Sequence, residues 1–391
     1  MKRFLLSTAA VLAVLSACSR EPMDKLTARV FATAASQYQA MDATLDEGML
    51  PRTIRDGALR QSDPTWWCAG FYPGSLWYIY LYSGDEAFRA LADKHTAKVW
   101  PETQVARSHD IGFVTNCSYG NAFRITGDTL YRQPVIDAAH ALCKRFNPVI
   151  GCTRSWNFSS EHAQWEFPVI IDNMMNLELL MEGYRLCGVD SLKAIALSHA
   201  NTTLKNHFRP DYTTWHVVDY CPEDGHVNMK CTHQGYSDDS AWARGQAWGL
   251  YGYTMMARKS GEPAYLSQAE NIAKMLLQRL PKDGIPYWDF DAPDIPDALR
   301  DASAGAIMAS AFIDLARQTA DSRLAKQCRK MAEKQLRTLA SPEYLVPVGE
   351  NCHFLLRHSV GFLPGNSEVD VPLTYADYYF LEALLKWQEV L

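Results

Sequence analysis

Apolar residues recur along most of the chain every three or four positions, the spacing of helices that bury one face. Residues 192–200 illustrate the pattern, with Leu192, Ile195, Leu197 and Ala200 among the apolar positions. Similar stretches predict helices at residues 25–45, 70–82, 86–99, 112–125, 129–146, 168–186, 239–259, 263–279, 302–318, 322–339 and 372–389. Strict alternation is rare, and only residues 212–220 and 284–290 are candidates for short strands or loops. The pattern therefore predicts an all-α protein.

A short turn motif separates several of these helices. It begins at Gly84, Gly127, Gly188 and Gly261, and a degenerate fifth copy begins at Ala320. Glycine ends a helix in the left-handed conformation, and the acidic residue that follows caps or charges the next helix. An apolar residue four places after the glycine anchors the new helix in the core. The repeat predicts consecutive helical hairpins.

The other connections are long and rich in aromatic residues, including Trp156, Trp165 and the segments 215–220 and 287–290. Short turns at one end and long loops at the other predict a closed ring of six hairpins, an (α/α)6 barrel. Its site would lie among the long loops. An open helical solenoid is the structural alternative.

The N-terminus has the pattern of a bacterial lipoprotein signal. Lys2 and Arg3 precede a mostly apolar stretch at residues 4–14, and Leu15-Ser16-Ala17-Cys18 has the spacing of a lipoprotein cleavage site. We therefore expect a signal peptide at residues 1–17, a lipidated Cys18 with a tether at residues 18–24, and one catalytic domain at residues 25–391. The expected location is the cell envelope of a Gram-negative bacterium, facing the periplasm or the surface. A plain secretory signal is the alternative.

The net charge, the cysteines and the missing cofactor motifs exclude several classes of function. A net charge of -6 argues against nucleic-acid binding. After the signal segment no apolar run in the sequence is long enough to span a bilayer, so membrane contact is expected only through the lipid anchor. Nine cysteines remain after Cys18, and a disulfide between Cys221 and Cys231 is our best prediction for a pair. The zinc, calcium, phosphate-loop and dinucleotide motifs are all missing from the sequence, so neither a metal nor a cofactor is expected.

Two aspartates are candidates for catalysis. Asp172 lies in a strongly apolar segment, and burial raises the pKa of a carboxyl group toward the range of a general acid. Asn176 is four residues further on, shares its helix face and could orient it. Asp110 follows His109 and precedes a helix, so it is either a catalytic group or an ordinary helix cap.

Eleven tryptophans suit a carbohydrate site, because sugar rings stack on aromatic faces. Those near loops or helix starts are Trp66, Trp67, Trp77, Trp156, Trp215, Trp242 and Trp248. About half should be core residues, Trp77 and Trp387 above all. Arg244 and Trp248 are four residues apart, so one helix face could grip a carboxylate and stack a ring. A buried structural arginine is the alternative.

Six segments in order resemble glycoside hydrolase family 88, the unsaturated glucuronyl hydrolases. They read WCAGFYPGSL from Trp67, HDIGF from His109, IIDNMMNLELL from Ile170, HQGYSDDSAWARGQAW from His233, RDASAGAI from Arg300 and EVDVPLTYADYYFLEAL from Glu368. The resemblance implies an (α/α)6 barrel that acts on the C4=C5 double bond left by polysaccharide lyases, with glycosaminoglycan disaccharides as the expected substrates. It implies hydration of that bond, which releases the nonreducing-end unsaturated uronic acid.

The resemblance also assigns residues. Asp172 matches the general acid/base, and Asp110 matches the second essential aspartate. The implied substrate contacts are Trp67, His109, Trp156, His216, Gln234, Arg244 and Trp248, with His233 and Tyr375 as weaker candidates. In the loop HSVGFLPG at residues 358–365, Phe362 and Leu363 are apolar, whereas hydroxyl and lysine side chains are expected about here in relatives that prefer sulfated sugars, so the sequence weakens the case for sulfate binding. An unsaturated rhamnogalacturonyl hydrolase, a non-catalytic sugar-binding lipoprotein and a helical scaffold are the alternative functions.

Overall fold

Left-handed glycines end four helices where the repeat predicts them. The computed structural model describes residues 20–160 and 162–391, and the predicted signal peptide and Cys18 lie outside these residues. Gly84, Gly127, Gly188 and Gly261 all have φ near +70°, which a residue without a Cβ adopts at little cost. In the fifth copy Asp321 caps the next helix by accepting the backbone N–H groups of residues 323 and 324. The turn motif is therefore confirmed.

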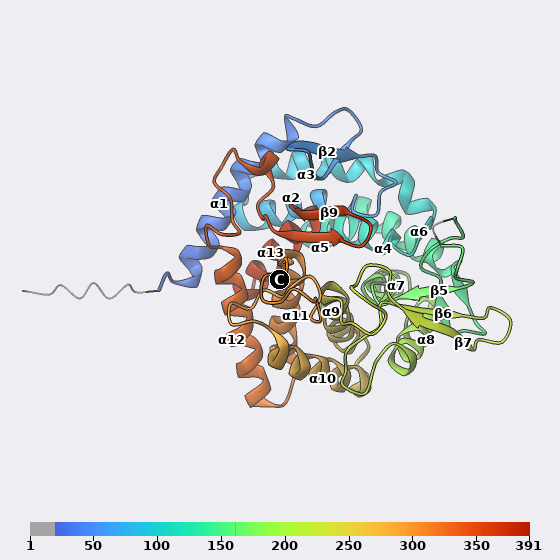
Figure 1. Cartoon of the computed structure of the whole chain (residues 1–391). Coiled ribbons are helices and arrows are strands. Elements are labelled where there is room, and N and C mark those ends of the chain that lie inside the picture. Colours follow the sequence, from blue (N-terminus) through green and yellow to red (C-terminus); the bar gives the residue numbers. More distant parts are fainter. Residues whose placement is uncertain (1–19, 161) are drawn as a thin grey trace, which may run out of the picture.

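Two concentric layers of helices form the molecule (Figure 1). The inner helices, which are buried along most of their length, are α2 (Phe71–Ser83), α4 (Ile111–Thr115) continuing through η2 (Asn116–Gly120) into α5 (Asn121–Thr126), α7 (Asn173–Cys187), α9 (Ala243–Ser260), α11 (Ala302–Gln318) and α13 (Thr374–Trp387). The outer helices are α1 (Met23–Asp42), α3 (Glu86–Lys98), α6 (Arg132–Cys143), α8 (Asp190–Asn206), α10 (Pro263–Arg279) and α12 (Ser322–Leu339).

The inner layer closes on itself. Each inner helix packs against the next, and α13 packs back against α2 through contacts such as Phe71 with Tyr378, whose ring centroids are 5.3 Å apart. This closure confirms the six-hairpin barrel and excludes the open solenoid. The short glycine turns follow the C-terminal ends of inner helices, so the long loops all enter at their N-terminal ends. Trp77 is fully buried, as predicted for a core residue.

Short antiparallel strands decorate the long loops. They are β1 (Leu50–Arg55) with β2 (Ala58–Ser62), β3 (Phe146–Asn147) with β4 (Cys152–Thr153), β5 (Pro168–Ile170) with β6 (Val217–Tyr220) and β7 (Val227–Cys231), and β8 (Ser359–Phe362) with β9 (Ser367–Val371). The short 3-10 helices are η1 (Trp100–Gln104), η3 (Thr129–Tyr131) and η4 (Asn351–His353). None of the helices in the described ranges is long and apolar enough to cross a membrane.

Several predicted boundaries were wrong. The helix predicted at 168–186 begins at Asn173, because residues 168–170 pair with β6 instead. The helix predicted at 112–125 is interrupted by a π-helical turn, and the one predicted at 239–259 begins only at Ala243. In the segment 212–220 only the last four residues form a strand, while residues 284–290 make isolated bridges.

The predicted disulfide between Cys221 and Cys231 was also wrong, since both are free thiols. Cys231 pairs with Val217 at the open end of the β6–β7 hairpin, whereas Cys221 follows Tyr220 at its turn. Four residues of strand therefore separate the two cysteines along the hairpin, about 13 Å at the usual rise per residue. A disulfide requires Cα atoms no more than about 7 Å apart.

Candidate active site

The pairing of β5 with β6 brings Asp172 to His216. Ile170 pairs with Val217, and the backbone N–H of Ile171 donates to the carbonyl of His216 at 3.0 Å. Asp172 is the next residue, between the end of β5 and the first turn of α7. Its Oδ2 lies 3.8 Å from Nε2 of His216. The strand register, which the sequence did not predict, therefore sets this contact.

His216 is held as a neutral ring with its proton toward Asp172. Its Nδ1 accepts the backbone N–H groups of His233 and Gln234 at 3.1 and 3.2 Å, so that nitrogen carries no proton. The proton of the neutral ring is therefore on Nε2, the atom that faces the Asp172 carboxyl. Burial holds the pKa of His216 well below its usual range, with further lowering by the neighbouring charges of His233 and Arg244.

Asp110 has a closely similar arrangement. The Ser108 hydroxyl donates to its Oδ2 at 2.8 Å, and Nε2 of His109 lies 3.4 Å from its Oδ1. The Asp110 side chain makes no capping hydrogen bond to α4, so the reading of this residue as an ordinary helix cap is wrong. Trp67, Ser108 and Asp110 line one narrow hollow. Ser108 was missed from the sequence, although it lies only two positions before Asp110.

Asn176 joins the two halves of the site. Its Oδ1 accepts the backbone N–H of Phe113 at 2.8 Å, which turns its NH2 group toward Nδ1 of His109 at 3.1 Å. His109 therefore also carries its proton on Nε2, and burial lowers its pKa to about 3. The prediction that Asn176 orients the Asp172 carboxyl was wrong. It contacts only the backbone carbonyl of Asp172, at 3.4 Å, and orients His109 instead.

Both aspartate carboxyls are enclosed. The pKa of Asp172 is raised to about 7, mainly by burial; the positive charge of Arg244 opposes this rise and the negative charge of Asp110 adds to it. Burial raises the pKa of Asp110 to about 6, against the lowering effects of Ser108 and Arg145. Each side chain keeps 13% of its surface exposed, so both can meet a ligand. Asp172 Oδ2 has no hydrogen-bond partner among the described residues.

The guanidinium group of Arg244 is held by other residues of the protein. It lies near the start of α9, donates to the carbonyls of Val360 and Gly361, and forms an ion pair of 3.2 Å with Asp301. Its side chain is 2% exposed and sits over the Trp242 ring at 4.5 Å. The structure thus supports the alternative of a buried structural arginine. Arg244 still acts on the site, because its charge lowers the pKa of Asp172.

Trp248 and Trp215 are also not stacking surfaces. Trp248 is fully buried, with ring contacts to Phe113 and Tyr379 at 5.3 and 5.5 Å. Its predicted role as a stacking platform is therefore wrong. The Trp215 ring is covered by Arg209 and Lys230, each 4.4 Å from its centroid.

Two of the tryptophans predicted to contact the substrate are partly exposed beside the two aspartates. Trp67 is half-buried and packs on Tyr375, with ring centroids 5.0 Å apart. Trp156 is half-buried and meets His216 edge-on at 5.8 Å. Tyr375 itself is 1% exposed, so it supports Trp67 rather than a ligand.

The β8–β9 hairpin also reaches the site, through a residue that was missed. The Phe362 ring lies 4.6 Å from the His233 ring, and His233 in turn packs against Trp156 at 5.3 Å. Phe362 belongs to the loop at residues 358–365, where its apolar character had been noted. Gln234 is placed by its backbone contact with His216.

The comparisons with known proteins agree on one family. No family model matches the chain. Over 328 residues it is 44% identical to the unsaturated glucuronyl hydrolase of Formosa agariphila, covering 83% of this chain and 80% of that one. It is 33% identical over 339 residues to the unsaturated glucuronyl hydrolase of Bacillus sp. GL1, covering 85% and 89%. The chain belongs to the unsaturated glucuronyl hydrolases.

Solved structures of this family of glycoside hydrolases have the same barrel. An unsaturated glucuronyl hydrolase specific for heparin superimposes with a TM-score of 0.90 at 45% identity, over 94% of this chain and 98% of that one. The enzyme of Streptococcus agalactiae superimposes with a TM-score of 0.87 at 28% identity, over 94% and 93%.

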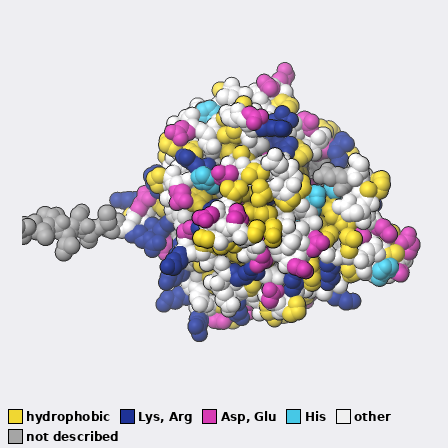
Figure 2. Space-filling model, in the orientation of Figure 1, with side chains coloured by type: hydrophobic (Ala, Val, Ile, Leu, Met, Phe, Trp, Pro, Cys, Tyr) yellow, Lys and Arg dark blue, Asp and Glu magenta, His cyan; other side chains and the backbone are white. Residues whose placement is uncertain are grey.

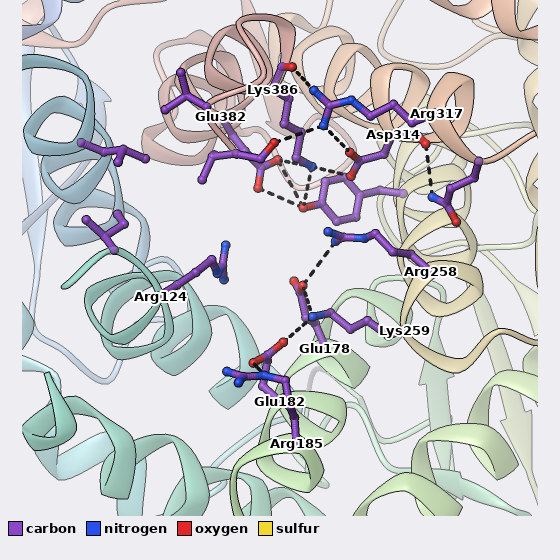
Figure 3. A pocket seen from close by; sticks show the side chains of 16 residues that line it. Arg124, Glu178, Glu182, Arg185, Arg258, Lys259, Asp314, Arg317, Glu382 and Lys386 are labelled. Atoms are coloured by element: carbon purple, nitrogen blue, oxygen red, sulfur yellow. Dashed lines mark hydrogen bonds and ion pairs between the residues drawn. The ribbon is translucent and has the colours of Figure 1, made fainter. Parts of the chain in front are cut away.

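A second hollow lies at the opposite end of this glucuronyl hydrolase barrel (Figure 3). Its volume is about 530 Å³, and it is lined by residues of inner helices, including Glu178, Arg258, Asp314 and Lys386. The basic side chains suit the negative ends of those helices. Most of them are engaged in ion pairs, such as Lys386 with Asp314 at 2.8 Å. This hollow is therefore a structural charge network, and Asp110 and Asp172 lie at the other end of the barrel.

Proposed function

We propose that this chain hydrates the C4=C5 double bond of the unsaturated uronate at the nonreducing end of glycosaminoglycan fragments made by lyases. The observation that carries the proposal is the Asp172 carboxyl, which is enclosed, has one oxygen without a protein partner and has a pKa of about 7. Such a group is protonated in part of the population at neutral pH and can donate its proton.

The reaction balances with these groups and one water. The proton of Asp172 is transferred to C4, and positive charge develops at C5 and the ring oxygen. The resulting Asp172 carboxylate removes a proton from the water whose oxygen bonds to C5. The C5 hemiketal then opens by breaking the bond between C5 and the ring oxygen, which leaves a ketone at C5 and a hemiacetal at C1. The hemiacetal collapses to an aldehyde, its C1–O bond to the remaining sugar breaks, and that sugar's oxygen takes the hemiacetal proton. The ionised form of Asp110 stabilises the positive charge.

The neutral histidines position these carboxyls. His216 directs its Nε2–H toward Asp172 and His109 directs the corresponding N–H toward Asp110. Because burial keeps the pKa of both rings low, neither adds a positive charge near pH 7 that would compete with the developing cation. Trp67 and Trp156 supply half-buried aromatic faces for sugar rings.

Glycosaminoglycan fragments are the proposed substrates because of the relatives. One similar structure is an unsaturated glucuronyl hydrolase specific for heparin, and another relative, 31% identical, is the unsaturated chondroitin disaccharide hydrolase of Streptococcus pneumoniae. A Streptococcus agalactiae enzyme variant, 26% identical, was solved in complex with dGlcA-GalNAc6S. The greater identity to the heparin-specific enzyme makes heparin-derived disaccharides the first substrates to test.

The test follows the absorbance of the conjugated double bond in disaccharides from heparin, chondroitin and pectin lyases. The wild type should consume a glycosaminoglycan disaccharide, and Asp172→Asn should lower kcat by about 10²- to 10⁴-fold. Asp190→Asn, the same change on exposed residue 190 of α8, should leave kcat unaltered. Consumption of pectin fragments alone, or of none, would overturn the proposal, and an unimpaired Asp172→Asn would overturn the role of Asp172.

We also propose that Cys18 is acylated, which would anchor the enzyme in the cell envelope. The support is the Leu15-Ser16-Ala17-Cys18 spacing behind a basic and apolar leader. Growth of the producing cells with labelled palmitate should label the wild type and leave Cys18→Ala unlabelled. A wild type without label would contradict the anchor and leave the proposed activity standing.

A further inference from the structure

Basic side chains gather on one side of the outer helix α12, in a chain whose net charge is -6. At about 100° per residue, its six cations fall within about 140° of the helix circumference. The buried residues, such as Leu324 and Ala332, occupy the opposite side. We call the six the α12 basic face: Arg323, Lys326, Arg329, Lys330, Lys334 and Arg337. Figure 2 shows Lys and Arg side chains gathered at the edge where the described chain begins.

Much of this charge is not neutralised by the protein. Glu333 is the single acidic residue within α12, and it is already shared between Arg337 at 2.8 Å and Arg20 at 3.6 Å. Arg323, Lys326 and Lys330 are exposed and form no ion pair with the residues that the structure describes. The face thus offers several free cations to an external anionic partner.

The start of the described chain is fastened beside this face. Arg337 donates to the carbonyl of Glu21 at 2.6 Å, and the Glu21 carboxylate pairs with Arg29 at 2.9 Å. Cys18 precedes Arg20 by two residues, which span at most about 7 Å of extended chain. An acyl group on Cys18 would therefore bring a bilayer surface close to α12.

We propose that the α12 basic face rests on an anionic phospholipid surface. The inference depends on the proposed lipid anchor for its location and on the observed charges for its chemistry. Lipid chains and a polybasic patch act together, because each adds favourable free energy to the same membrane contact.

The docked orientation leaves the active site open. α12 belongs to the outer layer, so its basic face points away from the barrel axis. Asp110 and Asp172 lie at the N-terminal ends of inner helices, at the mouth of the barrel. A membrane against α12 would run alongside the barrel, and oligosaccharides could still enter from the end. A polyanionic sugar chain is a different partner for the same charges, but it would be held away from the mouth where it is needed.

The experiment measures binding to vesicles. The chain from Ser19 onward, which contains every described element and has no acyl group, is titrated with vesicles of phosphatidylglycerol and phosphatidylcholine and with vesicles of phosphatidylcholine alone. We expect binding to the anionic vesicles that weakens as salt is raised. The triple variant Arg323→Gln, Lys326→Gln, Lys330→Gln should bind about 100-fold more weakly, at the usual contribution of each basic residue near a membrane.

A matched triple variant controls for net charge. Lys144→Gln, Lys205→Gln and Lys274→Gln remove three exposed lysines near other outer helices and should retain binding. Both variants should keep the wild-type kcat on a disaccharide. Equal binding to both kinds of vesicle, equal losses in the two triple variants, or binding to soluble chondroitin sulfate without binding to vesicles would each overturn the proposal. These outcomes are independent of palmitate labelling at Cys18, so failure of the anchor remains distinguishable.

Discussion

Asp110 and Asp172 share one environment, an enclosed carboxyl facing the Nε2–H of a neutral histidine, but they differ in hydrogen bonding. Ser108 donates to Asp110 at 2.8 Å, whereas Oδ2 of Asp172 has no partner among the described residues. A hydrogen bond to the charged form favours ionisation. The difference therefore makes Asp110 the carboxylate and Asp172 the acid near neutral pH.

This division predicts a narrow pH optimum for kcat. Asp172 must be protonated, so activity should fall as pH rises through about 7. Asp110 must be ionised, so activity should also fall as pH drops through about 6. The two limbs belong to the interacting pair, because each charge affects the other group.

A pH series of kcat on a lyase-generated disaccharide measures both limbs. In Asp110→Asn the loss of a neighbouring negative charge should lower the pKa of Asp172 and move the alkaline limb of the residual activity to lower pH. Activity that keeps rising to pH 9, or an alkaline limb that does not move, would be incompatible with Asp172 as the acid.

Single-residue predictions from the sequence were good where the local environment decides the chemistry. The apolar flanks of Asp172 do correspond to an enclosed carboxyl with a raised pKa. Spacing was a weaker guide to partners. Arg244 and Trp248 do occupy one helix, but spacing cannot reveal that the helix is surrounded by other inner helices and by β8, which bury both side chains.

At the scale of elements, the close contact between α4 and α7 holds the two halves of the site together. A Cβ on Gly112 would lie 2.4 Å from Oδ1 of Asn176 and 2.7 Å from its Cα. The Cα belongs to the backbone of α7, which cannot easily move away. Asn176 is the residue that fixes the His109 ring. Glycine at residue 112 therefore lets Asn176 hold the His109 ring in place, and that ring faces the Asp110 carboxyl.

Gly112→Ala should therefore impair activity more than folding. We expect the variant to lose about 1–3 kcal/mol of stability through overpacking, and to lose kcat at least about tenfold as His109 and Asp110 shift. Gly84→Ala is the matched control, since Gly84 has φ +67° and nothing within 4 Å of an added Cβ. It should lose about 1–2 kcal/mol and keep kcat. Urea unfolding and kcat measured on both variants test this, and equal kcat values would contradict it.

Helices and their turns could be predicted because helical period and left-handed glycines are local properties. The strands were largely missed, because β5 is three residues long and its pairing with β6 joins segments almost fifty residues apart. The same pairing sets the contact of Asp172 with His216. The sequence pattern therefore could not predict the contact between Asp172 and His216. Only the family resemblance placed both residues in one site.

At the scale of the molecule, buried carboxyl groups at the two ends of the barrel have pKa values shifted in opposite directions. At the far end Asp314 is paired with Lys386 at 2.8 Å, and the nearby charges of Lys386 and Arg258 hold its pKa below the ordinary value (Figure 3). At the mouth Asp172 has no Lys or Arg in contact among the residues that the structure describes, and burial raises its pKa to about 7. The far end therefore favours the ionised form of its carboxylates, whereas the mouth favours the protonated form of Asp172.

Replacing each aspartate by asparagine should therefore change stability with opposite sign. The charged form of Asp172 costs the folded state free energy, a cost fully present above pH 7 and absent below about pH 4, where the carboxyl is protonated in both states. Asp172→Asn should thus raise stability at pH 8 by on the order of 3 kcal/mol, or Tm by roughly 4 °C, and the gain should shrink toward pH 4. Asp314→Asn should lower stability at pH 8 by about 2 kcal/mol, because it removes one of the two carboxylates paired with the buried Lys386 and leaves Glu382 at 3.2 Å.

Thermal unfolding from pH 4 to pH 8 distinguishes these expectations. Asp190→Asn is an exposed control that should lower stability by at most about 1 kcal/mol, because Asp190 lies in the first turn of α8. The contribution of Asp314 is present above its ordinary pKa of 3.8 and is lost as pH falls, so the penalty of Asp314→Asn should be largest at pH 8. A loss of stability in Asp172→Asn at pH 8 would mean that its carboxylate is satisfied in the folded enzyme. In that case the free oxygen would give no reason for a raised pKa, and the assignment of the acid would have to move elsewhere.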